Sequence, residues 1–342
     1  MLVSIIIPVY NVAPYIEDCL RSVMRQTYLG EMECLIVDDC GTDESVPIAE
    51  RMVVKYDGPI RFEILHHEHN RGLSAARNTG MEIAAGDYIF FIDGDDEITE
   101  DCLEKMMSVV NKCPEVELVQ GVHMITHRDG KGRLGLKEIR MNHACTNDEV
   151  RCCFCEYHQV HMAAWNKLIK HSLIVDNKLS FIEGRLCEDI PWTFYLLKYV
   201  KNAFFLADVT YHYLIRPGSI CRGTTKDTIV IHRLKGYHDI VTNLTPGYEK
   251  QEIEHWSPLF IYYFLHLSYH IPELLEDLKI HWHYAREFRE FKLCGALAIC
   301  YVFRKTKWLG RIVYSFAKRV SNPGLILKDF ARLWSGIVCR IR

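Results

Sequence analysis

The sequence predicts an α/β protein, with a mostly parallel sheet flanked by helices and a helical C-terminal region. Three observations lead to this fold class. Short apolar, β-branched runs alternate with amphipathic helical patterns through residues 1–98. Two of these runs end in aspartates, and the carboxyl ends of parallel strands share one edge of a sheet. From about residue 227 the pattern is mainly helical and rich in aromatic residues and histidine.

The first part of the pattern divides into strands and helices in strict alternation. The apolar run at residues 3–8 stops at a proline, which is typical of a short buried strand. Residues 15–28 and 43–56 carry apolar side chains at helical spacing, and a third helix starts after the loop at residues 70–72. Further strands are predicted at residues 33–37, 62–65 and 88–92. This alternation favours a nucleotide-binding arrangement of the Rossmann kind, with helices on both faces of the sheet.

The second part is less regular. A helix is predicted at residues 99–113 and a strand at residues 116–126, followed by a polar, glycine-containing loop or hairpin at residues 128–145. Pro191 suits the first turn of a helix that runs to about residue 201. Residues 203–214 alternate loosely and are predicted to form a closing strand.

Composition places the chain among ordinary globular proteins, because 49% of its 342 residues are hydrophobic and 25% are charged. The first apolar run, residues 2–9, is short and has no basic region before it, so we expect no signal peptide and a cytoplasmic location. The 14 cysteines are scattered without framework spacing, which fits free thiols in a reducing compartment.

Charge is distributed unevenly along the chain. Residues 301–342 contain ten Lys or Arg and one acidic residue, whereas residues 1–300 contain 31 basic and 43 acidic residues. The basic tail also carries Trp and Phe at helical spacing, which favours binding to an anionic membrane surface. The alternative is a helical pair that packs on the acidic body. The apolar run at 293–303 is too short to span a bilayer, and no nucleic-acid module accompanies the tail.

Three carboxylates, Asp93, Asp95 and Asp96, follow the predicted strand at residues 88–92. Carboxylates this close repel one another, so the cluster indicates a divalent metal with oxygen ligands, Mn²⁺ or Mg²⁺. The alternative is a solvated turn that leads into a helix.

Two further groups of metal-binding residue types are weaker. The cysteines and histidines between Cys152 and His161 have zinc-type chemistry, but their spacing of three along one helix does not converge on a point. The histidines at residues 66–69 are expected to lie in a solvated loop.

Five motifs occur in a characteristic order, and with them the chain resembles the family 2 glycosyltransferases of the GT-A fold over residues 1 to about 220. They are Pro8-Val9-Tyr10-Asn11, Asp38-Asp39, the segment Asn70 to Gly80, Asp93-Gly94-Asp95-Asp96 and Glu188-Asp189. Trp165-Asn166-Lys167-Leu168 and the segment Tyr213 to Ile220 also look like elements of the bacterial surface-polysaccharide branch of that family.

The resemblance implies a role for each acidic residue. Asp95 would ligate the metal, and Asp93 would bind the donor ribose and reach the metal through water. Asp39 matches the acid that binds uracil, in a pocket lined by the loop that holds Pro8 and Tyr10. Asp189 matches the catalytic base.

Other residues are secondary candidates. Glu188 is an alternative base, and Asp96 is expected to start a helix. Arg71 and Arg77 stand where a loop enters a helix and could meet the diphosphate, although surface arginines are common. Trp165, Lys167 and Arg216 are candidates for the acceptor side, and an aromatic residue such as Trp165 is equally expected in the core.

The expected protein is therefore an inverting, metal-dependent glycosyltransferase. It would move a sugar from a nucleotide-diphosphate donor, expected to be a UDP-sugar, to a glycan or lipid-linked acceptor in surface polysaccharide or glycolipid assembly. Its domains would be a GT-A domain at 1–225, a helical region at 226–300 and a membrane-associating tail at 301–342. Within the GT-A domain, residues 1–98 would be the nucleotide-binding half and residues 99–225 the acceptor half. The tail would place the protein at the inner face of the cell membrane. The alternatives are a catalytically idle sugar-nucleotide-binding protein and a nucleotidyltransferase. The donor sugar, the acceptor and the oligomeric state do not follow from the sequence.

Overall fold

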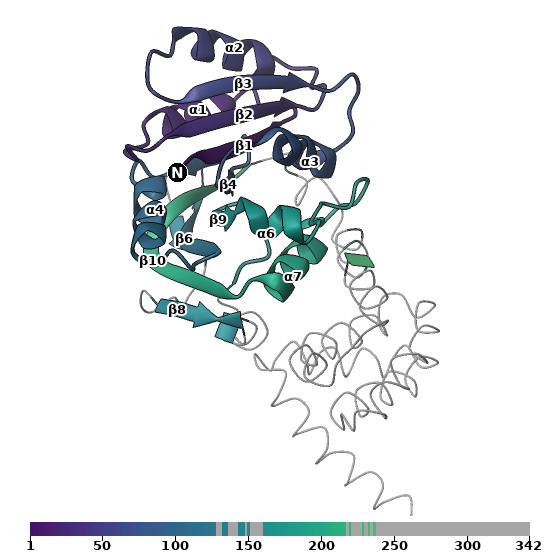
Figure 1. Cartoon of the computed structure of the whole chain (residues 1–342). Coiled ribbons are helices and arrows are strands. Elements are labelled where there is room, and N and C mark those ends of the chain that lie inside the picture. The colour runs from purple at the N-terminus through teal and green to yellow at the C-terminus, as the bar shows by residue number, and fades with distance from the viewer. Residues whose placement is uncertain are drawn as a thin grey trace, which may run out of the picture. The chain divides into compact units, whose positions relative to one another are not determined.

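One mixed sheet organises the part of the chain that the structure describes, with strand order β3-β2-β1-β4-β9-β6-β10-β5; β7 pairs with β6, and β8 pairs with β10 (Figure 1). The structure is a computed structural model, and it describes residues 1–127, 132–135, 143–147, 149–150 and 160–216, with a few single residues beyond them. The predicted helical region, the basic tail and the Cys152 to His158 part of the zinc-type motif lie outside the described residues, apart from those single positions.

Four parallel strands form the first part of the sheet, as predicted. They are β1 (Val3–Val9), β2 (Met32–Asp38), β3 (Arg61–His66) and β4 (Tyr88–Phe91). β1 pairs in parallel with both β2 and β4, and β2 pairs in parallel with β3. β1, β2 and β4 are buried almost throughout because both faces of the sheet are covered, whereas the edge strand β3 is partly exposed.

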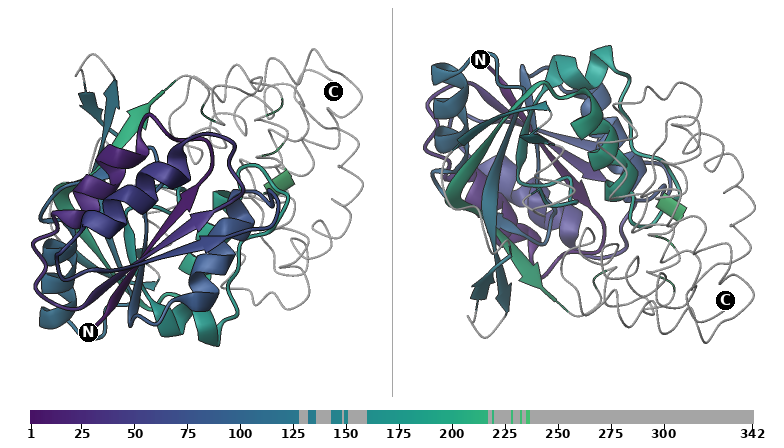
Figure 2. Two further views of the ribbon diagram at one scale, coloured as in Figure 1. Left: turned by 90° about the horizontal axis from the view of Figure 1, so that it is seen from above. Right: turned by 90° about the horizontal axis from the view of Figure 1, so that it is seen from below.

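Helices cover both faces of this parallel part (Figure 2). They are α1 (Ile16–Met24), α2 (Ser45–Lys55), α3 (Leu73–Ile83) and α4 (Cys102–Lys112). Buried side chains of α1 and α4 pack with Val3, Ile5 and Ile7 in one hydrophobic core. α3 lies on the opposite face, where a Cβ atom at Gly80 would come within 2.4 Å of the Ile6 side chain. Glycine at position 80 therefore allows α3 to approach the sheet closely.

The second part of the sheet is mixed in direction. β9 (Lys167–Lys170) runs antiparallel to both β4 and β6 (Leu118–His127). The sheet as a whole is therefore mixed, and the predicted parallel character is confirmed for β1 to β4 and for the pairing of β6 with β10. The remaining elements are β5 (Glu97–Ile98), β7 (Gly132–Leu134), β8 (His143–Thr146), α6 (His171–Asp176), α7 (Asp189–Tyr199) and β10 (Asn202–Ile215).

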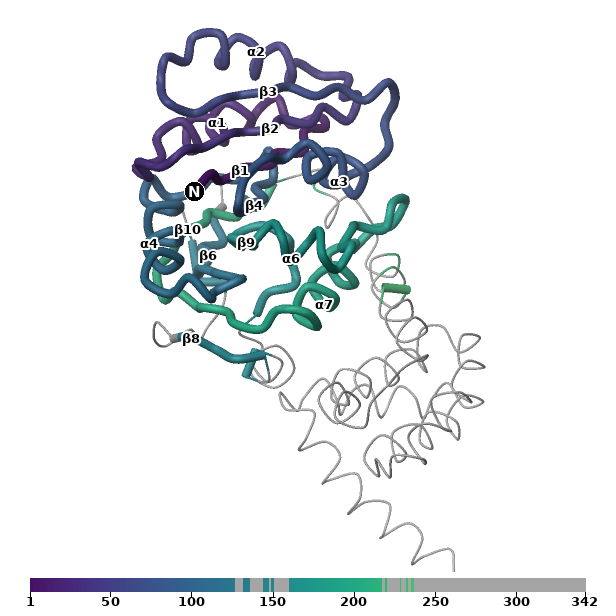
Figure 3. Tube along the Cα trace, viewed as in Figure 1, coloured from purple at the N-terminus to yellow at the C-terminus, as the bar shows by residue number. Residues whose placement is uncertain are grey.

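The direction of chain progression reverses between β1 and β4. From β1 the chain passes through α1 to β2 and then through α2 to β3. It then returns through α3 to β4, which lies on the other side of β1 (Figure 3). In open α/β sheets, ligands bind at the carboxyl edge beside such a reversal. The loops that follow β1, β2 and β4 therefore form the expected site.

The start of α4 and the end of α1 differ from the prediction because the neighbouring residues make contacts with distant parts of the chain. The helix expected from residue 99 begins at Cys102, because Glu97 and Ile98 first pair with β10 as β5. Helix α1 ends at Met24, before the expected residue 28, and Thr27 then donates its N–H to the carbonyl of Glu100. Among the described residues, no helix has the length and apolar character needed to cross a membrane.

Candidate active site

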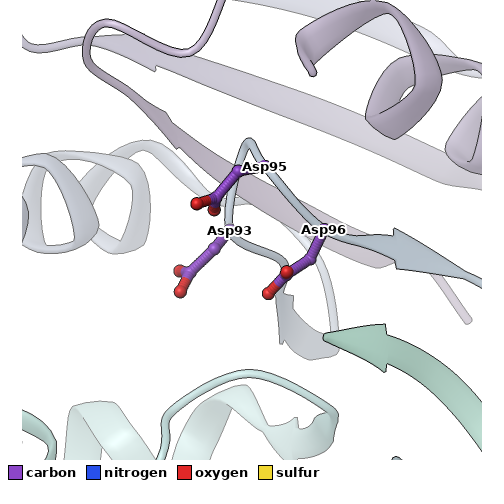
Figure 4. Close-up of side chains that lie close together, drawn as sticks. All are labelled: Asp93, Asp95 and Asp96. Atoms are coloured by element: carbon purple, nitrogen blue, oxygen red, sulfur yellow. The ribbon is translucent and has the colours of Figure 1, made fainter. Parts of the chain in front are cut away.

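The turn after β4 brings three carboxylates together. Asp93, Asp95 and Asp96 each offer an oxygen, and these oxygens lie within 4.8 Å of one another (Figure 4). A Cβ atom at position 94 would lie 3.1 Å from the carbonyl oxygen of Pro8, so Gly94 allows the turn to sit against the end of β1. Burial and the charge of Asp93 raise the pKa of Asp95. The cluster therefore forms at the sheet edge where the sequence predicts it.

Asp96 supports this turn from inside and does not start a helix as expected. Its side chain accepts hydrogen bonds from the Tyr211 hydroxyl at 2.7 Å and from the Leu214 N–H at 2.8 Å. The Tyr211 hydroxyl in turn accepts the N–H of Asp93 at 3.2 Å. Burial, followed by the charges of Asp95 and Asp93, raises the pKa of Asp96 well above its usual range. Asp96 and Tyr211 thus attach the acidic turn to β10.

The oxygen donors suit a hard divalent cation. Both carboxylate oxygens of Asp96 already have protein partners, whereas the side chains of Asp93 and Asp95 are 23% and 18% exposed. Arg216 donates its Nε–H to Asp95 and also lies 5.2 Å from the ring centre of Tyr15. Asp93 and Asp95 are therefore the residues that fit a metal ion, with Arg216 as the positive group that now neutralises Asp95.

Arg77 is the buried centre of the charge network. Its side chain is 1% exposed, and it reaches Asp93 at 2.8 Å, Glu188 at 2.8 Å and Asp189 at 2.9 Å. Its guanidinium also lies 5.2 Å from the ring centre of Phe181. Although burial opposes the charge, the three carboxylates hold the pKa of Arg77 above its usual value. One guanidinium on α3 therefore joins the turn after β4 to the start of α7.

Glu188 and Asp189 occupy different environments at that helix start. Glu188 is buried, and burial together with the charge of Asp189 raises its pKa to about 7, while Arg77 opposes the rise. Asp189 is 24% exposed and accepts the N–H of Ala164 at 3.2 Å. Burial also raises the pKa of Asp189, with Arg77 opposing. Asp189 is thus the more accessible carboxylate of the pair.

Asp39 follows β2 and organises the next loop of the edge. Its carboxylate accepts hydrogen bonds at 2.8 Å from the backbone N–H groups of Arg71 and Gly72, and at 2.8 Å from the side chains of Asn70 and His67. Asp39 is 2% exposed. Its four donors come from the segment that leads into α3, so Asp39 fixes the loop that precedes this helix.

The expectation of a solvated loop at residues 66–69 is confirmed for His66, Glu68 and His69, which are exposed, but not for His67. Its side chain is 5% exposed, and its second ring nitrogen lies 3.0 Å from the Thr79 hydroxyl on α3. The position of His67 directly after a parallel strand was the signal that could have identified it.

The remaining predicted residues of the nucleotide side lie on the surface of this edge or beneath it. Pro8 is buried in β1, and Tyr10 is 47% exposed just after that strand. Arg71 pairs with Glu183 at 3.1 Å, and the two side chains are 40% and 45% exposed. Arg71 thus remains accessible to a ligand, whereas Arg77 does not.

Trp165 and Lys167 lie beneath the edge, on the segment that enters β9. Trp165 is 8% exposed and stacks on Tyr211 at 4.4 Å and on Tyr213 at 5.6 Å between ring centres. Lys167 is fully buried. Of the two positions that the sequence allows for Trp165, the acceptor side and the core, the structure shows the core position. Its stacking connects the segment to Tyr211, which holds Asp96.

The structure therefore brings together Asp93, Asp95, Arg77, Glu188 and Asp189 through direct contacts, and it places Asp39 at the end of the neighbouring strand β2. The supporting roles of Tyr211 and the Ala164 N–H were not anticipated. A buried hydroxyl and a backbone amide leave no periodic or compositional signal in a sequence.

Comparison with known proteins identifies a matching family model and several relatives. A family model described as glycosyl transferase family 2 matches residues 4–155. The uncharacterized glycosyltransferase EpsJ of Bacillus subtilis is 31% identical over 239 residues, which cover 69% of this chain and 67% of EpsJ. The putative glycosyltransferase EpsH of the same organism is 34% identical over 221 residues, which cover 64% of this chain and 62% of EpsH.

A solved structure shares the fold. Residues 1–349 of TarS from S. aureus, crystallised with UDP-GlcNAc, align with a TM-score of 0.57 and 19% sequence identity over 86% of this chain and 90% of that one. With the ordered motifs, the acidic turn at the sheet edge and the match to EpsJ, the chain belongs to the family 2 glycosyltransferases and is a glycosyltransferase of the GT-A type.

Proposed function

We propose that this enzyme transfers a sugar, with inversion, from a nucleotide-diphosphate donor to a hydroxyl group of a glycan or lipid-linked acceptor, and that the donor is a UDP-sugar. The observation that carries the proposal is the Arg77 bridge, which holds Asp93 on the donor side and Asp189 on α7 to one buried guanidinium. A transferase needs a group that binds the leaving nucleotide and a separate base, and this bridge supports both within one site. The likeness of the fold to TarS, which was crystallised with UDP-GlcNAc, agrees with a UDP-sugar.

For the nucleotide we assign the edge formed after β1 and β2. Asp39 would shape the uracil pocket beside Pro8 and Tyr10 through the loop that it holds, because its two oxygens already accept four hydrogen bonds, and the same loop would place Arg71 near the diphosphate. Arg77 has both terminal nitrogens paired with carboxylates, so its proposed role is to support Asp93 and Asp189 and not to touch phosphate. Asp93 would bind the ribose.

For the metal we assign Asp95 with Asp93, and Asp96 as their support. A bound Mn²⁺ or Mg²⁺ would supply Lewis-acid stabilisation of the leaving diphosphate. Arg216 pairs with Asp95 and can therefore move to the negative charge of the donor when the carboxylate has another partner.

Asp189 is the proposed base. The acceptor oxygen would attack the anomeric carbon on the face opposite the diphosphate, and its proton would pass to the Asp189 carboxylate. The carboxylate is partly exposed, and Arg77 and the Ala164 N–H favour its ionised form. Glu188 is buried and its carboxylate contacts Arg77 at 2.8 Å, so its proposed role is to hold Arg77, and the more accessible Asp189 receives the proton from the acceptor.

The acceptor side and the location are proposed on sequence grounds. The basic tail at 301–342, with Trp and Phe at helical spacing, favours attachment to the inner face of the cell membrane, where lipid-linked acceptors of surface polysaccharide or glycolipid assembly are exposed. Residues 99–225, with Trp165 among them, would form the acceptor half, and residues 226–300 would form a separate helical region.

Donor hydrolysis with water as acceptor tests the base. Wild type, Asp189→Asn and Glu188→Gln are compared for sugar release and, by calorimetry, for donor binding. Asp189→Asn should lower turnover by roughly 100-fold or more while donor affinity is retained, and Glu188→Gln should keep most of the turnover. Retained turnover in Asp189→Asn would contradict the assignment, and loss in Glu188→Gln alone would make Glu188 the base.

A further inference from the structure

Lys167 at the start of β9 is a lysine with no exposed surface, and it binds atoms of the segment just before it. Its Nζ donates to the carbonyl oxygen of His161 at 2.8 Å and to the carbonyl oxygen of Ala163, and it lies 3.2 Å from Nδ1 of His161. An ammonium group has three N–H donors, and these three contacts match that number. All three N–H donors of Lys167 are therefore used by the turn at residues 161–163.

One of these carbonyls belongs to the peptide group that contacts the proposed base. The carbonyl of Ala163 and the N–H of Ala164 are two ends of the same planar, trans peptide unit. Lys167 binds the carbonyl end, and Asp189 accepts the N–H end at 3.2 Å. Because the unit is rigid, a hold on its carbonyl oxygen fixes the direction of its N–H. A cation on the carbonyl also polarises the peptide and strengthens the hydrogen bond that the N–H donates.

We propose that Lys167 is a positioning residue for Asp189: it holds the peptide between Ala163 and Ala164 so that the N–H of Ala164 keeps the Asp189 carboxylate oriented for proton transfer. The inference rests on the proposed role of Asp189 as base. Lys167 touches neither donor nor acceptor in this arrangement, because it is buried and all its contacts are internal.

Electrostatics support the same relation between the two residues. Burial lowers the pKa of Lys167 to about 7, while the charge of Asp189 raises it and that of Arg77 lowers it further. Conversely, the charge of Lys167 favours ionised Asp189. The groups that face this pair are Arg77 from α3, Asp93 from the turn after β4, Glu188 at the start of α7, and two histidines beside Lys167, His161 and His123 on β6.

The test compares donor hydrolysis by wild type and Lys167→Met over a range of pH. Lys167→Met should lower kcat by roughly ten-fold, because a hydrogen bond to a charged group is lost, with the KM for donor unchanged. Loss of the positive charge raises the pKa of Asp189, so the acid limb of the kcat profile should move to higher pH by roughly half a unit or more. Lys170→Met, at the other end of β9, is the matched control and should keep the wild-type profile.

A purely structural role would reduce the amount of folded enzyme but would leave the acid limb in place, and that outcome overturns the inference. If Lys167→Met does not fold, Lys167→Gln carries the same test, because it removes the charge but keeps an N–H donor. Asp189→Asn, measured in parallel, separates the two proposals. Full turnover in Asp189→Asn overturns the base assignment and this inference together. An inactive Asp189→Asn with an unshifted acid limb in the Lys167 variants overturns this inference alone.

Discussion

Replacing Arg77 with methionine should destabilise the protein in a pH-dependent way. The substitution removes the cation from three carboxylates at 2.8, 2.8 and 2.9 Å in a place where Arg77 is 1% exposed. Removing one partner of a buried ion pair costs about 3–5 kcal/mol, because the other charges stay buried without compensation. Three charge-assisted hydrogen bonds would contribute more in total, at about 1.5–3 kcal/mol each. Because one of the carboxylates can take up a proton when Arg77 is absent, we expect a loss of unfolding free energy of about 3–5 kcal/mol and not the larger sum.

The pH dependence follows from the direction of the pKa shifts. Arg77 lowers the pKa values of Glu188 and Asp189, so its removal raises them further above the values of the unfolded chain. The folded variant then binds more protons than the unfolded chain, and its stability falls as pH rises. Urea unfolding followed by circular dichroism should therefore show a larger loss of stability at pH 8 than at pH 5.

The control for this experiment is Arg71→Met, which makes the same substitution in an exposed ion pair with Glu183. Its unfolding free energy should change by less than about 1 kcal/mol. A loss in Arg77→Met that is equally small, or equal at the two pH values, would refute the account of Arg77 as the buried centre of the site.

Three further predictions concern other parts of the network. Asp39→Asn should weaken nucleotide binding, measured by calorimetry with UDP, because Asn replaces one acceptor oxygen with an NH₂ group that faces N–H donors; unchanged affinity would contradict the role of Asp39. Glu188→Gln should flatten the fall in stability between about pH 4.5 and 7, because folded Glu188 retains a proton there that the unfolded chain releases. If the melting temperature of the variant has the same pH profile as that of the wild type, Glu188 is not protonated in the folded protein. Deletion of residues 301–342 should abolish flotation on anionic liposomes, and equal flotation of both chains would exclude the tail as the membrane-binding segment.

The acidic positions could be predicted from sequence because each has a local signal. Asp39 and the turn at residues 93–96 directly follow buried strands, and the carboxyl ends of neighbouring parallel strands meet at one edge. Asp189 has no such signal near the other acids. It was found through the motif order, and the structure joins it to Asp93 through Arg77.

The positive groups could not be predicted in the same way. An arginine within a helix is usually exposed, and nothing in the neighbourhood of Arg77 in sequence marks it as buried. Its burial depends on carboxylates that are 16, 111 and 112 residues away. The contacts of Lys167 and Tyr211 likewise arise from tertiary packing, and periodicity carries no information about a peptide N–H such as that of Ala164. The direction of β9 also depends on pairing with two strands distant in sequence.

The most direct test of the central claim is hydrolysis of a panel of UDP-sugars by the wild-type chain and by Asp95→Asn, with Mn²⁺, Mg²⁺ or EDTA. The account predicts that the wild type releases sugar from at least one donor with a divalent metal present, and that EDTA or Asp95→Asn reduces the rate by roughly 100-fold or more. Tight binding of a UDP-sugar without turnover of any nucleotide sugar under any of these conditions would contradict the claim and would indicate an idle nucleotide-binding protein.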